Sequence, residues 1–189
     1  ETSPLARAEW MRFYGLLFGV SEKADRLFHQ VNSCYTAYKQ QCEKIGPGRS
    51  VIMDKIAGTV WYMPGGKSTI GQMLKDAGAS YPWADDEQSG SLSLPFKAVL
   101  ERAGEADVWM LRYDGDKPMK LQQLLAEQEG YSQFEAYQTG EVYGCNVMTS
   151  LFYEEAPFRP DRLLSDFIQI MHPGIKPATP LKYYQKLNP

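Results

Sequence analysis

The stretch VWYMPGGKST, residues 60–69, has the glycines, the lysine and the hydroxyl side chains of a phosphate-binding loop. That loop follows the pattern G-x-x-x-x-G-K-[ST], in which both glycines let main-chain N–H groups surround the phosphates. Counting back five positions from Gly66 reaches Trp61, where the pattern requires glycine. The stretch therefore does not predict a nucleotide site, and the Trp61–Tyr62 pair needs another explanation.

Residue combinations for catalysis or metal binding are also missing from the rest of the sequence. No G-x-S-x-G nucleophile motif occurs, and neither His29 nor His172 has a cysteine partner at a suggestive spacing. The segment DDEQSG begins like a calcium loop, but Phe96 stands where that loop requires a bidentate glutamate. We therefore expect no enzyme activity, no cofactor and no metal site.

The composition indicates a globular protein rich in aromatic residues. Of the 189 residues, 43% are hydrophobic and 23% are charged, which is ordinary for a soluble domain. The formal net charge of -3 provides no field that attracts nucleic acid, so we expect no such partner. Twelve tyrosines and four tryptophans suit a binding cleft, because each offers a flat apolar face and a polar tip.

The cysteines and the chain ends add little about the compartment. Cys34 and Cys42 lie eight positions apart in a predicted helix, about 12 Å along its axis, too far for a disulfide. Neither they nor Cys145 has metal-site spacing. We find no signal peptide, membrane-spanning run or lipidation motif, and a chain that opens on ETSPLARAEW is expected to be a processed or truncated piece.

Two helices are predicted at the start of the chain. The first covers residues 4–19, with Pro4 in its first turn and Gly19 after its end. The second covers residues 21–45, with Ser21 as its N-cap and a length of about 36 Å. A helix of that length extends beyond one small lobe, which favours a role as a strut.

After Gly48 short strands and helices alternate, which favours an α/β fold. We predict a three-layer α/β/α lobe with a mostly parallel central sheet, preceded by the long helix. Ser93 is the expected cap of the helix that starts there, and Ser132 with Glu135 the expected capping box of a later one. The strands are expected over residues 50–58 and 59–63 (as a hairpin), 106–113 and 141–145, and the helices over 68–78, 93–104, 117–128, 132–140 and 159–173.

Ligands of parallel sheets lie at the carboxyl ends of the strands, so the residues at those ends form the predicted binding site. Aromatic rings, one arginine and an amide there would hold a bulky, partly anionic or polar ligand. Two alternatives stay open: Trp61 and Trp109 belong to the core, and Arg112 only pairs with Asp114. The predicted ligand-binding residues are Trp61, Tyr62, Arg112, Tyr113 and Asn146 at the strand ends, and Trp83 in the loop after the first helix of the lobe.

Three segments stand in a characteristic order and spacing along the chain. They are the W-Y-x-P-G-G-x-S turn at residues 61–68, the D-A-G-A helix end at 76–79 and the R-P-D-x-L-L-x-D helix start at 159–166. Together with the two opening helices, they resemble the carboxyl-terminal half of substrate-binding proteins of ABC importers. The class concerned carries iron–siderophore complexes, haem or cobalamin. The resemblance extends over nearly the whole chain.

The resemblance implies a protein of two lobes joined by one rigid helix. Residues 1–20 would be the last helical segment of an amino-terminal lobe missing from this sequence, residues 21–46 the inter-lobe helix and residues 47–189 the carboxyl-terminal lobe. Trp61 and Tyr62 would face the cleft between the lobes. The implied function is to capture an iron–siderophore-type complex, or alternatively haem or cobalamin, and deliver it to the importer's membrane permease. The implied location is periplasmic, with a lipid anchor on the full-length protein.

One position departs from the family, and one other class of function remains. Each lobe of such proteins presents an acidic residue to arginines of the permease, and Lys97 stands where that residue is expected. Either Glu87 or Glu101 takes over this contact, or the contact itself differs. The alternative function is half of a two-lobed α/β enzyme, such as a glycosyltransferase-like protein, which needs a general base or a phosphate cradle at the same sheet edge.

Overall fold

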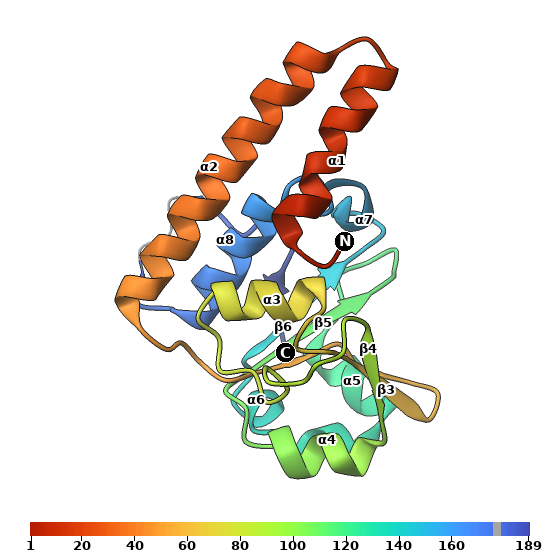
Figure 1. Cartoon of the computed structure of the whole chain (residues 1–189). Helices are drawn as coiled ribbons and strands as arrows, with labels where there is room; N and C mark the ends of the chain where they lie inside the picture. The colour runs from red at the N-terminus through yellow and green to blue at the C-terminus, as the bar shows by residue number, and fades with distance from the viewer. Residues whose placement is uncertain (176–178) are drawn as a thin grey trace.

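In the computed structural model, which describes residues 1–175 and 179–189, a pair of helices projects from a layered α/β lobe (Figure 1). Helix α1 (Pro4–Leu17) and helix α2 (Ser21–Ile45) lie against each other along the length of α1. The second half of α2 packs on α8 and α3, and Phe158 of the lobe packs against the cluster that the two helices form around Val31. Within the described residues, no helix is long and apolar enough to cross a membrane.

The tip of the helix pair is tight because a glycine lies at the contact. A Cβ added at Gly15 would come within 2.4 Å of the Cβ of Ala24, so only glycine lets α1 approach α2 this closely. Gly19, at a φ of 69°, then turns the chain. The prediction that Ser21 caps α2 is wrong: Ser21 is already helical, the N-cap is Val20, and no side chain caps this end.

The central sheet has the strand order β1-β5-β6-β7. Strands β1 (Val51–Met53), β5 (Val108–Tyr113) and β6 (Val142–Asn146) are parallel, and only the short β7 (Gln185–Lys186) is antiparallel. Helices α3 (Thr69–Asp76) and α8 (Pro160–Met171) lie on one side of this sheet, and α4 (Phe96–Ala103) and α6 (Glu135–Gln138) on the other (Figure 1). The predicted three-layer fold with a mostly parallel sheet is confirmed.

A second sheet, which was not predicted, is antiparallel and has the order β2-β3-β4. It contains β2 (Ile56–Ala57), β3 (Val60–Pro64) and β4 (Ser91–Leu94). The single strand predicted over residues 50–58 is therefore wrong: Asp54, at a φ of 57°, turns the chain out of the central sheet. The predicted hairpin is confirmed, because Ala57 pairs with Val60 across a turn that contains Gly58 at a φ of 64°.

Several predicted helix boundaries are also wrong. Ser93 lies in β4, where it pairs with Tyr62, so α4 starts only at Phe96. The Ser132 hydroxyl donates to the carbonyl of Glu129 within a 3₁₀ helix, η1 (Glu129–Gln133), so no capping box forms with Glu135. Helix α5 (Leu121–Glu127) precedes η1, and α7 (Phe152–Glu155) follows β6 without having been predicted.

Candidate functional site

A cavity of about 280 Å³ lies beyond the carboxyl end of β5. Arg112 of β5 contributes the charged group from the lobe, and Arg7 contributes a second one from α1. The other walls come mainly from apolar and aromatic side chains of α3 and α7, among them Met73, Phe152 and Tyr153. Mostly apolar walls with a few polar groups are typical of small-molecule sites, so this cavity is the candidate site.

Arg112 is held in the cavity wall by Asp54. Its Nε and Nη2 donate to the two carboxylate oxygens of Asp54 at 2.8 and 2.6 Å, which is a bidentate ion pair. Asp54 follows β1, and Arg112 lies near the end of the adjacent parallel strand β5, so the same sheet edge carries both residues. The interpretation that Arg112 pairs with Asp114 is wrong, because the carboxylate partner comes from the neighbouring strand end.

The main chain of Asp54 is fixed as firmly as its side chain. Its N–H donates to the carbonyl of Met110 at 2.7 Å, and its carbonyl accepts the indole N–H of Trp109 at 2.6 Å. The left-handed backbone at Asp54 lets the residue make these bonds while its carboxylate faces Arg112. Asp54 therefore fixes where the guanidinium lies.

The environment of Arg112 leaves part of its guanidinium available. Burial lowers the pKa of Arg112, but the hydrogen bonds and the charge of Asp54 outweigh this effect and raise the pKa above its usual value. The guanidinium carbon lies 5.8 Å from the centroid of the Phe152 ring, within the range of a cation–π contact. Its Nη1 donates to none of the described residues, so these N–H groups can bind an oxygen atom of a ligand.

Two exposed side chains border the same cavity. Arg7 is exposed on α1 and forms no ion pair with any described residue. Tyr153 on α7 is 60% exposed although it lines the cavity. Both can therefore contact a molecule larger than the cavity itself.

The prediction that Trp61 faces a cleft is wrong. Trp61 is fully buried, and its ring packs among Trp109, Tyr131 and Phe134 with centroid distances of 5.5–5.7 Å. Its indole N–H donates to the carbonyl of Met53 at 2.8 Å. The alternative interpretation, in which Trp61 and Trp109 belong to the core, is the one that the structure supports.

The remaining predicted residues do not line the cavity either. Trp83 is buried beneath the guanidinium of Arg102, and the buried Tyr113 accepts a hydrogen bond from the main-chain N–H of Met119 through its hydroxyl. The amide of Asn146 donates to the carbonyl of Gly115, joining the loops that follow β6 and β5. Tyr62 is half exposed on β3. The structure thus brings only Arg112 of the six residues to this cavity.

The PGGKS turn, residues 64–68, has a structural role. The N–H groups of Gly65 and Lys67 donate to the carbonyls of Gly90 and Gln88, and that of Ser68 to the carbonyl of Gly65. A Cβ at Gly65 would lie 2.4 Å from the carbonyl oxygen of Gln88, so glycine is needed for close packing on the loop before β4. Because these N–H groups already have acceptors, they do not form a cradle for phosphate.

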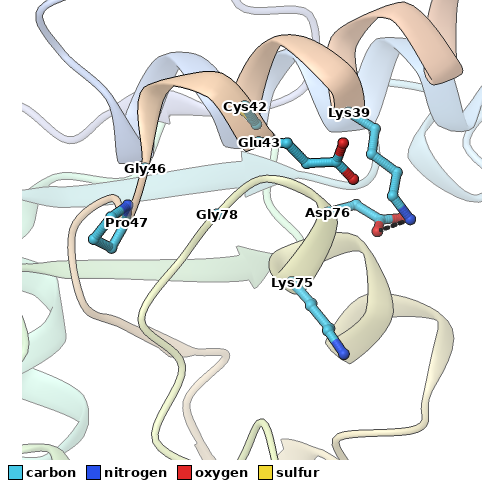
Figure 2. A pocket seen from close by; sticks show the side chains of 8 residues that line it. All are labelled: Lys39, Cys42, Glu43, Gly46, Pro47, Lys75, Asp76 and Gly78. Carbon is cyan, nitrogen blue, oxygen red and sulfur yellow. Dashed lines mark ion pairs between the residues drawn. The ribbon is translucent and has the colours of Figure 1, made fainter.

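A second hollow, of about 340 Å³, lies at the carboxyl end of α2 (Figure 2). Lys39 of α2 reaches across to Asp76 of α3 there, with a distance of 2.8 Å between Nζ and Oδ1. Asp76 also accepts a hydrogen bond from the Tyr35 hydroxyl at 2.8 Å. Because Asp76 is already occupied by groups from α2, this hollow marks where the long helix is attached to the lobe.

Arg7, Asp54, Phe152 and Tyr153 were missed by the sequence analysis. Asp54 was missed because the sequence predicts one strand over residues 50–58, whereas β1 ends at Met53 and Asp54 follows it. Arg7 had no signal in the sequence, because only the packing of α1 on the lobe brings it to the strand ends.

No metal site is found in the described part of the chain. Residues 1–175 and 179–189 contain no group of three or more His, Cys, Asp or Glu side chains placed to hold a metal ion.

Comparison of sequences gives one family and several distant relatives. Residues 1–147 match the family model described as periplasmic binding protein. Two uncharacterized lipoproteins of Methanocaldococcus jannaschii are 22% identical over 192 residues and 26% identical over 195 residues. The alignments cover 100% of this chain, but 44% and 48% of those relatives. The chain therefore spans about half the length of the curated relatives it matches.

Comparison of structures gives similar folds at low sequence identity. The TroA-like periplasmic binding protein FepB from Veillonella parvula has a TM-score of 0.68 at 14% identity, covering 96% of this chain and 61% of that one. The structure titled ABC-type Fe3+-hydroxamate transport system, from Saccharomonospora viridis, has a TM-score of 0.67 at 20% identity, with coverages of 87% and 55%. IsdE of S. aureus, complexed with heme, has a TM-score of 0.66 at 16% identity, with coverages of 90% and 66%. At these identities the likeness establishes the fold alone.

Proposed function

The chain belongs to the periplasmic binding protein family, and from this premise we propose that it is the carboxyl-terminal lobe of the substrate-binding component of an ABC importer. The ligand that we propose is an iron–siderophore-type complex, which the protein captures and delivers to the permease in the membrane. Support for this ligand class comes from the fold, which resembles a protein titled as part of an Fe3+-hydroxamate transport system. Haem and cobalamin are the alternative ligands, and the similar fold of a haem complex favours haem of the two.

The observation that carries the proposal is the cavity at the carboxyl end of β5. It offers the free N–H groups of Arg112 above apolar walls, which suits a bulky chelate with oxygen atoms on its surface. A cavity of about 280 Å³ is at the small end for a drug-sized ligand, so the lobe would hold one side of the chelate. Arg7 and Tyr153 would contact the part that extends out of the lobe.

We propose a division of the chain that follows from this function. Residues 1–20 would belong to an amino-terminal lobe, residues 21–46 would join the lobes as a rigid helix, and residues 47–189 form the second lobe. The length of the relatives, about twice that of this chain, supports a further lobe. The projecting position of α1 and the start of α2 supports the same division (Figure 1). The lipoprotein names of the relatives support a periplasmic location with a lipid anchor on the full-length protein.

The test is a titration with a ferric trihydroxamate, a ferric tricatecholate, haem and cyanocobalamin. We expect the two-lobed protein to bind one of them and Arg112→Gln to weaken that binding at least about tenfold, since a hydrogen bond from a charged group contributes roughly 1.5–3 kcal/mol. The control is Lys97→Gln, which removes the same charge from an exposed position on α4. If no probe binds, or if Arg112→Gln binds as the parent does, this site assignment is wrong.

The isolated lobe should bind much more weakly than the two-lobed protein. If two lobes together provide about 8 kcal/mol and one lobe keeps half of the contacts, its dissociation constant falls in the millimolar range. Tight binding by residues 1–189 alone would contradict a site shared between two lobes.

We infer that the chain has no catalytic activity, because its family is one of substrate-binding proteins. The alternative, half of a two-lobed α/β enzyme, requires a phosphate cradle or a general base at the sheet edge. The bonded N–H groups of the PGGKS turn do not favour it, and Lys67 pairs with the carboxylate of Glu87. Saturable ATP turnover that is lost in a Lys67→Ala variant would overturn this inference.

A further inference from the structure

The ion pair in the cavity wall has a consequence for the charge of the ligand. The side chain of Asp54 is 16% exposed and that of Arg112 is 31% exposed, so both charges lie in a partly desolvated wall. The carboxylate takes the Nε and Nη2 edge of the guanidinium and leaves the Nη1 edge unbonded. The pair thus offers N–H donors to a ligand while its net charge is zero.

We propose that Asp54 is a specificity-determining residue of this site, which makes the lobe prefer chelates with uncharged oxygen acceptors, such as ferric trihydroxamates, over anionic chelates, such as ferric tricatecholates. The inference rests on the function proposed above. Asp54 does not line the cavity and acts through Arg112, so it is a positioning residue. From behind the guanidinium, its carboxylate charge would repel an anionic ligand and offset much of the attraction of Arg112.

The second arginine does not remove this preference. Arg7 is exposed on α1, where water and salt screen its charge. Asp54 and Arg112 are more buried, so their charges act on a bound ligand at a lower effective dielectric constant. The main-chain bonds of Asp54 to Met110 and Trp109 keep its carboxylate in place when a ligand enters.

The experiment compares the binding of an uncharged and an anionic chelate in one set of variants. An uncharged ferric trihydroxamate and an anionic ferric tricatecholate are titrated into residues 1–189 and into the two-lobed protein proposed above. We expect the parent to favour the uncharged chelate. Asp54→Asn should shift the ratio of the two affinities at least about tenfold towards the anionic chelate, since tenfold is the effect on each ligand charge at about 8 Å and an effective dielectric constant of about 30.

A structural role alone would not produce the accompanying salt dependence. In Asp54→Asn the affinity for the anionic chelate should fall as salt is added, more steeply than in the parent, because the arginine charge is no longer neutralised. The matched control is Asp85→Asn, which removes the same charge from an exposed residue in the loop after α3. That control should leave the ratio unchanged.

A second variant keeps the proposal testable if Asp54→Asn fails to fold. Arg112→Gln leaves the carboxylate of Asp54 without its counter-charge, so the affinity ratio should move in the opposite direction, towards the uncharged chelate. If binding depends on Arg112 but neither variant changes the ratio, the role of Asp54 is refuted while the proposed function stands. If neither chelate binds to any form of the protein, both proposals fail together.

Discussion

The indole rings of Trp61 and Trp109 lie with their centroids 5.7 Å apart, and their N–H groups bond to the carbonyls of two consecutive residues, Met53 and Asp54. Trp61 comes from the antiparallel sheet and Trp109 from the central sheet. The pair therefore fixes the point at which the chain passes from one sheet to the other. Because Asp54 holds Arg112, the two rings position the cavity wall without contacting a ligand.

Replacing Trp61 by phenylalanine should destabilise the lobe by about 2–3 kcal/mol. The substitution leaves the buried carbonyl of Met53 without its donor and opens a gap among the rings of the core. Urea unfolding followed by circular dichroism measures the change. Tyr62→Phe is the control, since this half-exposed side chain should change stability by less than about 0.5 kcal/mol. Equal effects of the two variants would show that the indole bond is unimportant.

The attachment of α2 to the lobe should depend on Asp76. Asp76→Ala leaves the buried hydroxyl of Tyr35 without an acceptor and removes the partner of Lys39, which should cost about 1–3 kcal/mol. Hydrogen exchange should become faster in the second half of α2. Glu43→Ala is the control, because Glu43 lines the same hollow but forms no ion pair with the described residues.

A double-mutant cycle separates this hydrogen bond from other effects of Asp76→Ala. In a Tyr35→Phe background, Asp76→Ala should cost less than in the parent, because the unpartnered hydroxyl is then absent. Additive effects of the two substitutions would contradict the proposed coupling between α2 and α3.

The free energy of unfolding should fall in alkaline solution, because two of the three thiols are buried. Burial raises the pKa of Cys42 and that of Cys145 to about 11. A pKa raised in the folded state contributes stability that is present below the unfolded pKa, near 9, and is lost as the pH rises through 11. Burial also raises the pKa of Tyr131 to about 12, which extends the loss to higher pH.

Two measurements check these expectations. The free energy of unfolding should decrease between pH 9 and 11 by about 1–2 kcal/mol for each buried thiol, and Cys145→Ala should remove its share of that slope. At pH 8 a thiol reagent should modify the partly exposed Cys34 quickly and the two buried cysteines slowly. Three equally fast thiols would mean that these helices and strands open readily.

The sequence predicted the layers of the fold because strands and helices alternate with clear spacing after residue 48. It could not predict the second sheet, since β3 pairs with β4, which lies beyond α3, and β4 has no strong strand pattern of its own. The two-residue period of a strand does exclude one part of the predicted site. Neighbouring side chains of a strand point to opposite faces, so Trp61 and Tyr62 could not both face one cleft.

The candidate site was harder to predict because its contacts join distant positions. Arg112 was placed correctly at a strand end, but its partner Asp54 lies 58 positions away, and the nearby Asp114 is exposed. Arg7 reaches the cavity only through the packing of α1 on the lobe. The alternation of polar and apolar residues along one strand predicts which face of the sheet a side chain lies on. It does not predict the partner of that side chain, because the partner can come from a distant part of the sequence.

The last prediction concerns the apolar surface of α1. Four large side chains at helical spacing are 44–62% exposed: Trp10, Phe13, Tyr14 and Leu17. The opposite face of the helix packs on α2. A stripe of this size is unusual on a solvated helix, and we expect the amino-terminal lobe proposed above to cover it. In the two-lobed protein, the pair Phe13→Glu and Leu17→Glu should cost about 2–4 kcal/mol, since burial of one large apolar side chain contributes roughly 1.5–3 kcal/mol and both are partly buried already.

The isolated chain should be much less sensitive to the same two substitutions. There the exposed parts of Phe13 and Leu17 contact only water, so the glutamates should lower the free energy of unfolding much less than in the two-lobed protein, and they should reduce both dye binding and self-association. Met148→Glu is the control in both forms, because this residue is 61% exposed in the loop after β6. If the paired substitution leaves the two-lobed protein as stable as its parent, no lobe packs on this face and α1 does not belong to the amino-terminal lobe.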